Sequence, residues 1–131
     1  MQGKTQKARI LIVDDDPDNI TILREILKNR YAVLAATSGQ TAISLAAGNP
    51  PPDLILLDIK MPNMDGYDVL KTLKTSQRTR NIKIVFVTAK RTVDDKMTAY
   101  EKGIEDYVTK PIDPEFVLQI VERLIRDRAN R

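Results

Sequence analysis

Four short stretches of the chain, three of them apolar throughout, lead into polar residues that are able to do chemistry. Residues 10–13 lead into Asp14 and Asp15, residues 54–57 into Asp58, residues 84–87 into Thr88, and residues 106–108 lead towards Lys110. Carboxylates that converge without a counter-ion repel one another, and the pKa of at least one of them rises. Mg²⁺ relieves this repulsion and keeps coordination sites for phosphate oxygens. The pattern therefore predicts phosphoryl chemistry, if the fold brings these ends together.

Each of these residues also has an ordinary structural interpretation. The acidic run before Pro17 is suited to capping a helix, with Asp16 as N-cap. Asp58 could simply begin a turn. Thr88 could pack in a core, and Lys110 could be solvated. The chemical interpretation is favoured because every one of these positions falls at the carboxyl end of a predicted strand.

The hydrophobic pattern alternates between strands and helices along the whole chain. Strands are expected at 10–13, 31–36, 54–57, 84–87 and 106–108, and helices at 17–29, 38–47, 66–74, 92–102 and from 113 onwards. Strict alternation predicts an α/β fold with a parallel five-stranded sheet and helices on both faces. In the flavodoxin-like order 2-1-3-4-5, Asp14, Asp15 and Asp58 meet at the switch point of the sheet.

Composition and length predict a single globular domain. The chain has 131 residues, of which 42% are apolar and 30% charged, with a net charge of +3. The small basic excess lies mainly in the tails, so we expect no direct nucleic-acid binding. No apolar run approaches the roughly 18 residues of a membrane span, and we expect a cytoplasmic protein without a membrane anchor. Cysteine and histidine are absent, which excludes a phosphohistidine on this chain.

Four sequence blocks occur in an order and at a spacing that are typical of one family. They are Ile12-Val13-Asp14-Asp15-Asp16, Leu57-Asp58-Ile59-Lys60-Met61-Pro62-Asn63-Met64-Asp65-Gly66, Val87-Thr88-Ala89 and Asp106-Tyr107-Val108-Thr109-Lys110-Pro111. In these blocks the chain resembles the receiver domain of two-component response regulators. The likeness covers nearly all of residues 8–127. It leaves residues 1–7 as a flexible lead and residues 128–131 as a tail or the start of a linker.

The resemblance implies a phosphoacceptor switch. Asp58 would take a phosphoryl group from the phosphohistidine of a partner histidine kinase or phosphotransfer protein, as an exposed anionic nucleophile. Asp14 and Asp15 would position Mg²⁺ together with Asp58, and the Lys60 backbone carbonyl would complete the protein ligands. Such a domain catalyses only its own phosphorylation and dephosphorylation.

The resemblance also implies a second group of residues around the phosphoryl group. Thr88 and Lys110 would contact it, and Tyr107 would change orientation as the Thr88 hydroxyl is drawn towards it. The Lys110-Pro111 peptide bond would be cis. The surface formed by the helix at 92–102, the strand at 106–108 and the final helix would meet partners or a second receiver. Here that surface would include Lys96, Tyr100 and Tyr107.

Three alternatives remain open at this level. Lys60 and Lys90 each lie two residues beyond a site residue and could pair with the phosphoryl group or hinder hydrolytic water, or could simply be solvated. A haloacid-dehalogenase-like phosphotransferase would use Asp14 as nucleophile, although Asp18 stands where that family has threonine or valine. A scaffold with the same fold and no phosphorylation is the third interpretation, against which the intact acidic cluster argues.

Overall fold

The computed structural model describes residues 7–129. Residues 1–6 of the predicted lead and residues 130–131 of the predicted tail lie outside the described residues, whereas residues 128 and 129 form the end of the last helix. Along the chain the elements are β1 (Arg9–Val13), α1 (Pro17–Leu27), β2 (Ala32–Ala36), α2 (Gly39–Ala46), β3 (Leu54–Leu57), α3 (Gly66–Thr75), β4 (Lys83–Thr88), α4 (Val93–Glu101), β5 (Asp106–Thr109) and α5 (Pro114–Ala129).

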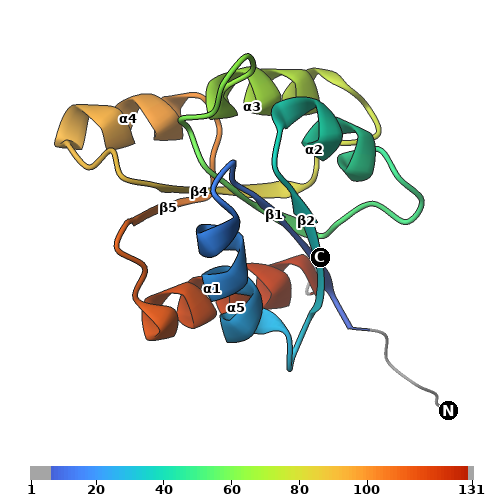
Figure 1. Ribbon diagram of the computed structural model, residues 1–131. Coiled ribbons are helices and arrows are strands. Elements are labelled where there is room, and N and C mark those ends of the chain that lie inside the picture. Colours follow the sequence, from blue (N-terminus) through green and yellow to red (C-terminus); the bar gives the residue numbers. More distant parts are fainter. Residues whose placement is uncertain (1–6, 130–131) are drawn as a thin grey trace, which may run out of the picture.

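The strands form one parallel sheet in the order β2-β1-β3-β4-β5. This is the predicted flavodoxin-like topology, and Figure 1 shows the helices in two layers around the sheet. Val13 lies in register with Leu57, and Leu57 with Phe86, so β1, β3 and β4 end side by side. The polar residues that follow these strands are consequently delivered to a single edge.

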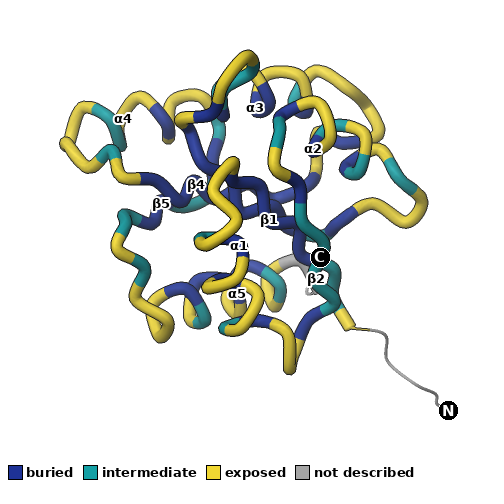
Figure 2. Tube along the Cα trace, in the orientation of Figure 1, coloured by how far each residue is buried: buried dark blue, intermediate teal, exposed yellow. Residues whose placement is uncertain are grey.

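Two hydrophobic cores hold the sheet between its helices. One core lies under α2, α3 and α4 and includes Leu11, Ile55 and Phe86. The other lies under α1 and α5 and includes Ile12 and Leu56. Every residue of β3 and β4 is buried (Figure 2), as expected for central strands of a parallel sheet that is covered on both faces.

The predicted element ends lie within two residues of the observed ends, and helix caps explain two of the differences. Ser38 and Thr92 are not helical residues but extended N-caps, whose side chains accept from the N–H groups of Thr41 and Asp95. Helix α1 ends at Leu27 rather than near residue 29. Asp16 is the predicted N-cap of α1 and accepts from the Asp18 N–H.

The start of α3 is held tightly against the residue that follows β3. Asp65 and Asp68 form a reciprocal capping box, and the Gly66 N–H donates to the Ile59 carbonyl at 2.8 Å. A Cβ atom on Gly66 would lie 2.5 Å from the Asp58 carbonyl oxygen and 2.8 Å from the Ile59 Cα. Only glycine fits here, because both obstructing atoms belong to the backbone.

We therefore expect Gly66→Ala to lower the free energy of unfolding by about 1–3 kcal/mol, the usual cost of overpacking. Urea denaturation followed by circular dichroism measures this change. Gln40→Ala, an exposed helical position, is the matched control and should alter stability by less than about 0.5 kcal/mol. Equal stability of Gly66→Ala and the control would contradict the close approach.

Candidate phosphoryl-transfer site

At the centre of the site, one lysine pairs with two buried carboxylates, and each of the three residues follows a different strand. The Lys110 ammonium donates to Asp58 Oδ2 at 2.8 Å and to Asp14 Oδ2 at 2.9 Å. Asp14 and Asp58 are only 2% and 6% exposed. Lys110 follows β5, whereas the carboxylates follow β1 and β3, so only the sheet order brings the three together. Buried carboxylates require such a partner, because an unpaired buried charge is costly.

A third carboxylate, that of the exposed Asp15, joins this pair. Oxygen atoms of Asp14, Asp15 and Asp58 all lie within 4.8 Å of one another. With the Lys110 ammonium, the cluster keeps a formal excess of two negative charges. An oxygen-only donor set with this charge suits a hard divalent cation such as Mg²⁺.

Burial and pairing act in opposite directions on the pKa values of the cluster. Burial raises the pKa of Asp14 above its ordinary value, and the hydrogen bond from Lys110 only partly offsets this. Burial alone would lower the pKa of Lys110, but its hydrogen bonds to Asp58 and Asp14 outweigh burial and leave that pKa raised. Lys110 is therefore a permanent cation at neutral pH, aimed at both buried carboxylates.

In the loop after β4, the backbone of Lys90 contacts both Thr88 and Tyr107. The Lys90 N–H lies 3.4 Å from Thr88 Oγ1, and the Lys90 carbonyl accepts a hydrogen bond of 2.8 Å from the Tyr107 hydroxyl. Thr88 is fully buried and Tyr107 is 5% exposed. The two side chains thus share a neighbour, although they stand on different strands.

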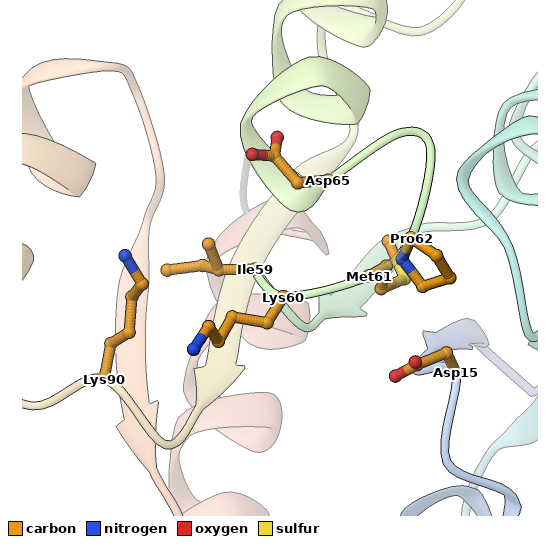
Figure 3. Close-up of a pocket in the computed structure, with 7 residues that line it drawn as sticks. All are labelled: Asp15, Ile59, Lys60, Met61, Pro62, Asp65 and Lys90. Atoms are coloured by element: carbon orange, nitrogen blue, oxygen red, sulfur yellow. The ribbon is translucent and has the colours of Figure 1, made fainter.

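A pocket of about 460 Å³ opens beside the acidic cluster (Figure 3). It is lined by residues that follow β1, β3 and β4, namely Asp15, Ile59, Lys60, Met61, Pro62, Asp65 and Lys90. Lys60 and Lys90 lie on separate loops, and both line this pocket. The Lys60 N–H lies 3.4 Å from Asp58 Oδ1, so the backbone here helps to orient Asp58.

The structure corrects two expectations and adds one residue. Asp58 is buried rather than exposed, and its ion pair with Lys110 compensates the buried charge. Tyr107 was expected on the surface around the fourth helix, but its ring is packed inside against Phe86 at 6.3 Å. The Lys110-Pro111 bond is cis, as the resemblance implied. Asp65 is the added residue: it lines the pocket and caps α3. Its spacing of three residues from Asp68 is typical of a capping box and could have predicted the cap from the sequence.

Comparisons with known proteins agree with this geometry. The family model described as "Response regulator receiver domain" matches residues 10–122. The chain therefore belongs to the receiver domain family of two-component response regulators. In this family the domain is a phosphoacceptor, and Mg²⁺ binds at the acidic pocket.

Similar proteins differ in how much of their own length the chain covers. A Vibrio cholerae protein named "Probable cyclic di-GMP phosphodiesterase" is 44% identical over 125 residues, which are 95% of this chain and 28% of that protein. Protein PilH of Pseudomonas aeruginosa is 36% identical, with 90% of this chain and 98% of that protein covered. The receiver domain of sensor histidine kinase PA1611 from Pseudomonas aeruginosa, solved with magnesium in its active-site cleft, is 28% identical with a TM-score of 0.82, over 91% of this chain and 98% of that chain. The chain thus spans little more than a quarter of the first of these relatives.

The alternative of a haloacid-dehalogenase-like phosphotransferase receives no support. Residues 10–122 match the receiver family. Asp14, the nucleophile of that alternative, is buried and accepts hydrogen bonds from Lys110 and the Asp16 N–H. Within residues 7–129 we also find no helix with the length and apolar content of a membrane span.

Tyr107 provides a test of the packing at this site through its ionisation. Burial raises the pKa of Tyr107 from 10.0 to about 12, so the folded state favours the neutral phenol. This stabilisation is complete below pH 10 and is lost as pH rises from 10 to about 12. The stability advantage of wild type over Tyr107→Phe should fall by about 1 kcal/mol between about pH 9 and about pH 11. Urea denaturation at both pH values measures it; a constant advantage would contradict the buried phenol.

Proposed function

We propose that Asp58 is the phosphoacceptor of this receiver domain and that the residues around it form its phosphoryl-transfer site. The observation that carries the proposal is the convergence of Asp58, Asp14 and Lys110 at 2.8 and 2.9 Å on the carboxyl edge of the sheet. The phosphoryl donor is the phosphohistidine of a histidine kinase or phosphotransfer protein. Receivers of this family interact with such proteins.

In the proposed transfer an Asp58 carboxylate oxygen forms a bond to phosphorus while the bond from phosphorus to the donor imidazole nitrogen breaks. Asp14, Asp15 and the Lys60 carbonyl would hold Mg²⁺ together with Asp58, and the bound ion would neutralise phosphoryl oxygens. Lys110 already contacts Asp58 and needs only a small shift to pair with a phosphoryl oxygen. Alignment and positive charge are most of what this reaction requires.

The proposed switch starts at Thr88. Its oxygen lies 3.4 Å from the Lys90 N–H, which leaves the hydroxyl hydrogen for donation to a phosphoryl oxygen. Movement of Thr88 towards that oxygen would take the acceptor away from Lys90. The Lys90 carbonyl, which holds the Tyr107 hydroxyl, would then be free to move, and Tyr107 with it. A local hydrogen bond would in this way bias a two-state element.

The surface formed by α4, β5 and α5 is the proposed place for partners or a second receiver. It exposes Val93, Met97 and Phe116, with exposed fractions of 72%, 56% and 44%. Asp106, at the start of β5, accepts hydrogen bonds from Tyr100 and Arg123. Exposed apolar side chains beside polar ones are typical of protein contact surfaces, and we assign no direct nucleic-acid binding to this domain.

We further propose residues 8–127 as the receiver unit of a cytoplasmic protein. Residues 128–131 would then be a tail or the start of a linker. The domain catalyses only its own phosphorylation and dephosphorylation.

Phosphorylation by acetyl phosphate and Mg²⁺ tests the central assignment. Intact-mass spectrometry should show the mass of one added phosphoryl group on wild type and none on Asp58→Asn, because the amide is not a nucleophile. Asp94→Asn removes an exposed carboxylate from α4 and should retain full labelling. Label on Asp58→Asn would overturn the assignment, and label located on Asp14 would restore the phosphotransferase alternative.

Hydrolysis of the phosphorylated protein tests the role of the two flanking lysines. We propose that Lys60 and Lys90 pair with the phosphoryl group or hinder the attacking water, and so lengthen its lifetime. Replacing both by methionine should speed dephosphorylation by about 2- to 10-fold, a barrier change of roughly 0.4–1.4 kcal/mol. Loss of label after donor removal measures the rate. Lys28→Met, at the C-terminal cap of α1, is the control, and equal rates in the double variant and wild type would refute the proposed role.

A further inference from the structure

A second pocket lies between α3 and α4, and the proposed function does not use it. This α3–α4 groove has a volume of about 410 Å³ and is lined by Tyr67, Asp68, Leu70, Lys71, Lys74, Thr75 and Lys102. Its lining shares no residue with the pocket beside the acidic cluster. Its size is within the range of about 300–1,000 Å³ that is typical of small-molecule sites.

The charges of the groove are unbalanced. It carries Lys71, Lys74 and Lys102, and within residues 7–129 none of these ammonium groups forms an ion pair or a side-chain hydrogen bond. Asp68, the single acidic lining residue, already accepts from the Asp65 N–H at 3.0 Å in the capping box of α3. The lysines therefore have no anionic partner of their own in the groove.

The two helices bring these lysines together from both sides. Lys71 and Lys74 stand on one face of α3, whereas Lys102 caps the end of α4. The Lys74 Cε lies 3.5 Å from the position that a Cβ atom on Gly103 would take. The Lys74 side chain thus crosses from α3 to the end of α4, and cations from both helices surround one volume.

The remaining lining residues are suited to a flat apolar group. Tyr67 is partly exposed and Leu70 is buried beneath the groove. The Tyr67 ring packs edge-on against Phe86, with centroids 5.2 Å apart, and Phe86 packs against Tyr107 at 6.3 Å. A continuous row of three rings therefore leads from the groove to the residue that we assign to the switch.

We propose that the α3–α4 groove binds a small ligand that combines phosphate groups with an aromatic ring, as a nucleotide does, and that its occupancy reaches Tyr107 through Tyr67 and Phe86. The lysines would bind the phosphates through charge-assisted hydrogen bonds, and Tyr67 and Leu70 would contact the ring. The effect on signalling rests on the proposed function, whereas binding itself does not. Lysines that merely complement the helix C-termini would stabilise α3 and α4 without binding any ligand.

Titration of the ¹⁵N-labelled chain with ATP, adenosine and tripolyphosphate tests the binding. EDTA is present so that no metal reaches Asp58, and about 0.15 M salt screens long-range attraction. ATP should shift the amides of residues 67–75 and 102–103 in a saturable way, and about tenfold more tightly than either fragment. Absence of saturable shifts, or equal binding of tripolyphosphate, would overturn the proposal.

Two sets of variants locate the site. Changing Lys71, Lys74 and Lys102 together to glutamine should weaken ATP binding by about tenfold or more. Changing Arg24, Lys28 and Arg126 to glutamine removes the same charge from α1, its C-cap and α5 and should leave the affinity unchanged. An equal loss of ATP affinity in both triple variants would mean that ATP is attracted by the overall positive charge, and it would contradict a site in the groove.

Tyr67→Leu tests the row of rings. In wild type, ATP should also shift the amides of Phe86 and Tyr107; in Tyr67→Leu these distant shifts should vanish while those of residues 71–75 persist. Distant shifts that survive in Tyr67→Leu would overturn the connection. Because neither metal nor phosphoryl donor is present, failure here is distinguishable from failure of Asp58 as phosphoacceptor.

Discussion

The organisation of this protein depends on one electrostatic constraint, which is that Asp14 and Asp58 are buried side by side and share the Lys110 ammonium. Two buried carboxylates without a cation would be driven to protonate. The arrangement therefore requires the ends of β1, β3 and β5 to converge, and the parallel sheet in the order β2-β1-β3-β4-β5 brings them together. The exposed Asp15 adds further negative charge, which leaves the cluster ready for a divalent cation.

The loop after β4 links this acidic cluster to Tyr107. Thr88 ends the strand between Asp58 and Lys110, and its loop passes from the acidic cluster to Tyr107. Lys90 offers its N–H towards Thr88 and its carbonyl to Tyr107. A short chain of hydrogen bonds therefore joins the neighbourhood of Asp58 to Tyr107. The ring of Tyr107 packs against Phe86, and Phe86 packs against Tyr67 on α3. The pocket beside the acidic cluster and the α3–α4 groove thus border one connected interior.

Most of the fold was predictable from local patterns. Apolar runs that end in Asp14, Asp58 and Thr88 predict buried strands, and helical periodicity between them predicts the crossovers. Element ends were less predictable because a cap residue such as Ser38 or Thr92 is polar and adjacent to the helix, yet extended in its backbone. Local pattern does not distinguish the last extended residue from the first helical one.

By itself, the sequence determined which residues have reactive side chains and that they fall at strand ends, because strand periodicity and carboxylate chemistry are local properties. Only the tertiary structure decided that Lys110, 52 residues after Asp58, would lie 2.8 Å from it. It also decided that Asp58 is buried, that Tyr107 faces inward, and that lysines of α3 and α4 surround one groove. These features depend on the packing of distant segments, which no local pattern specifies.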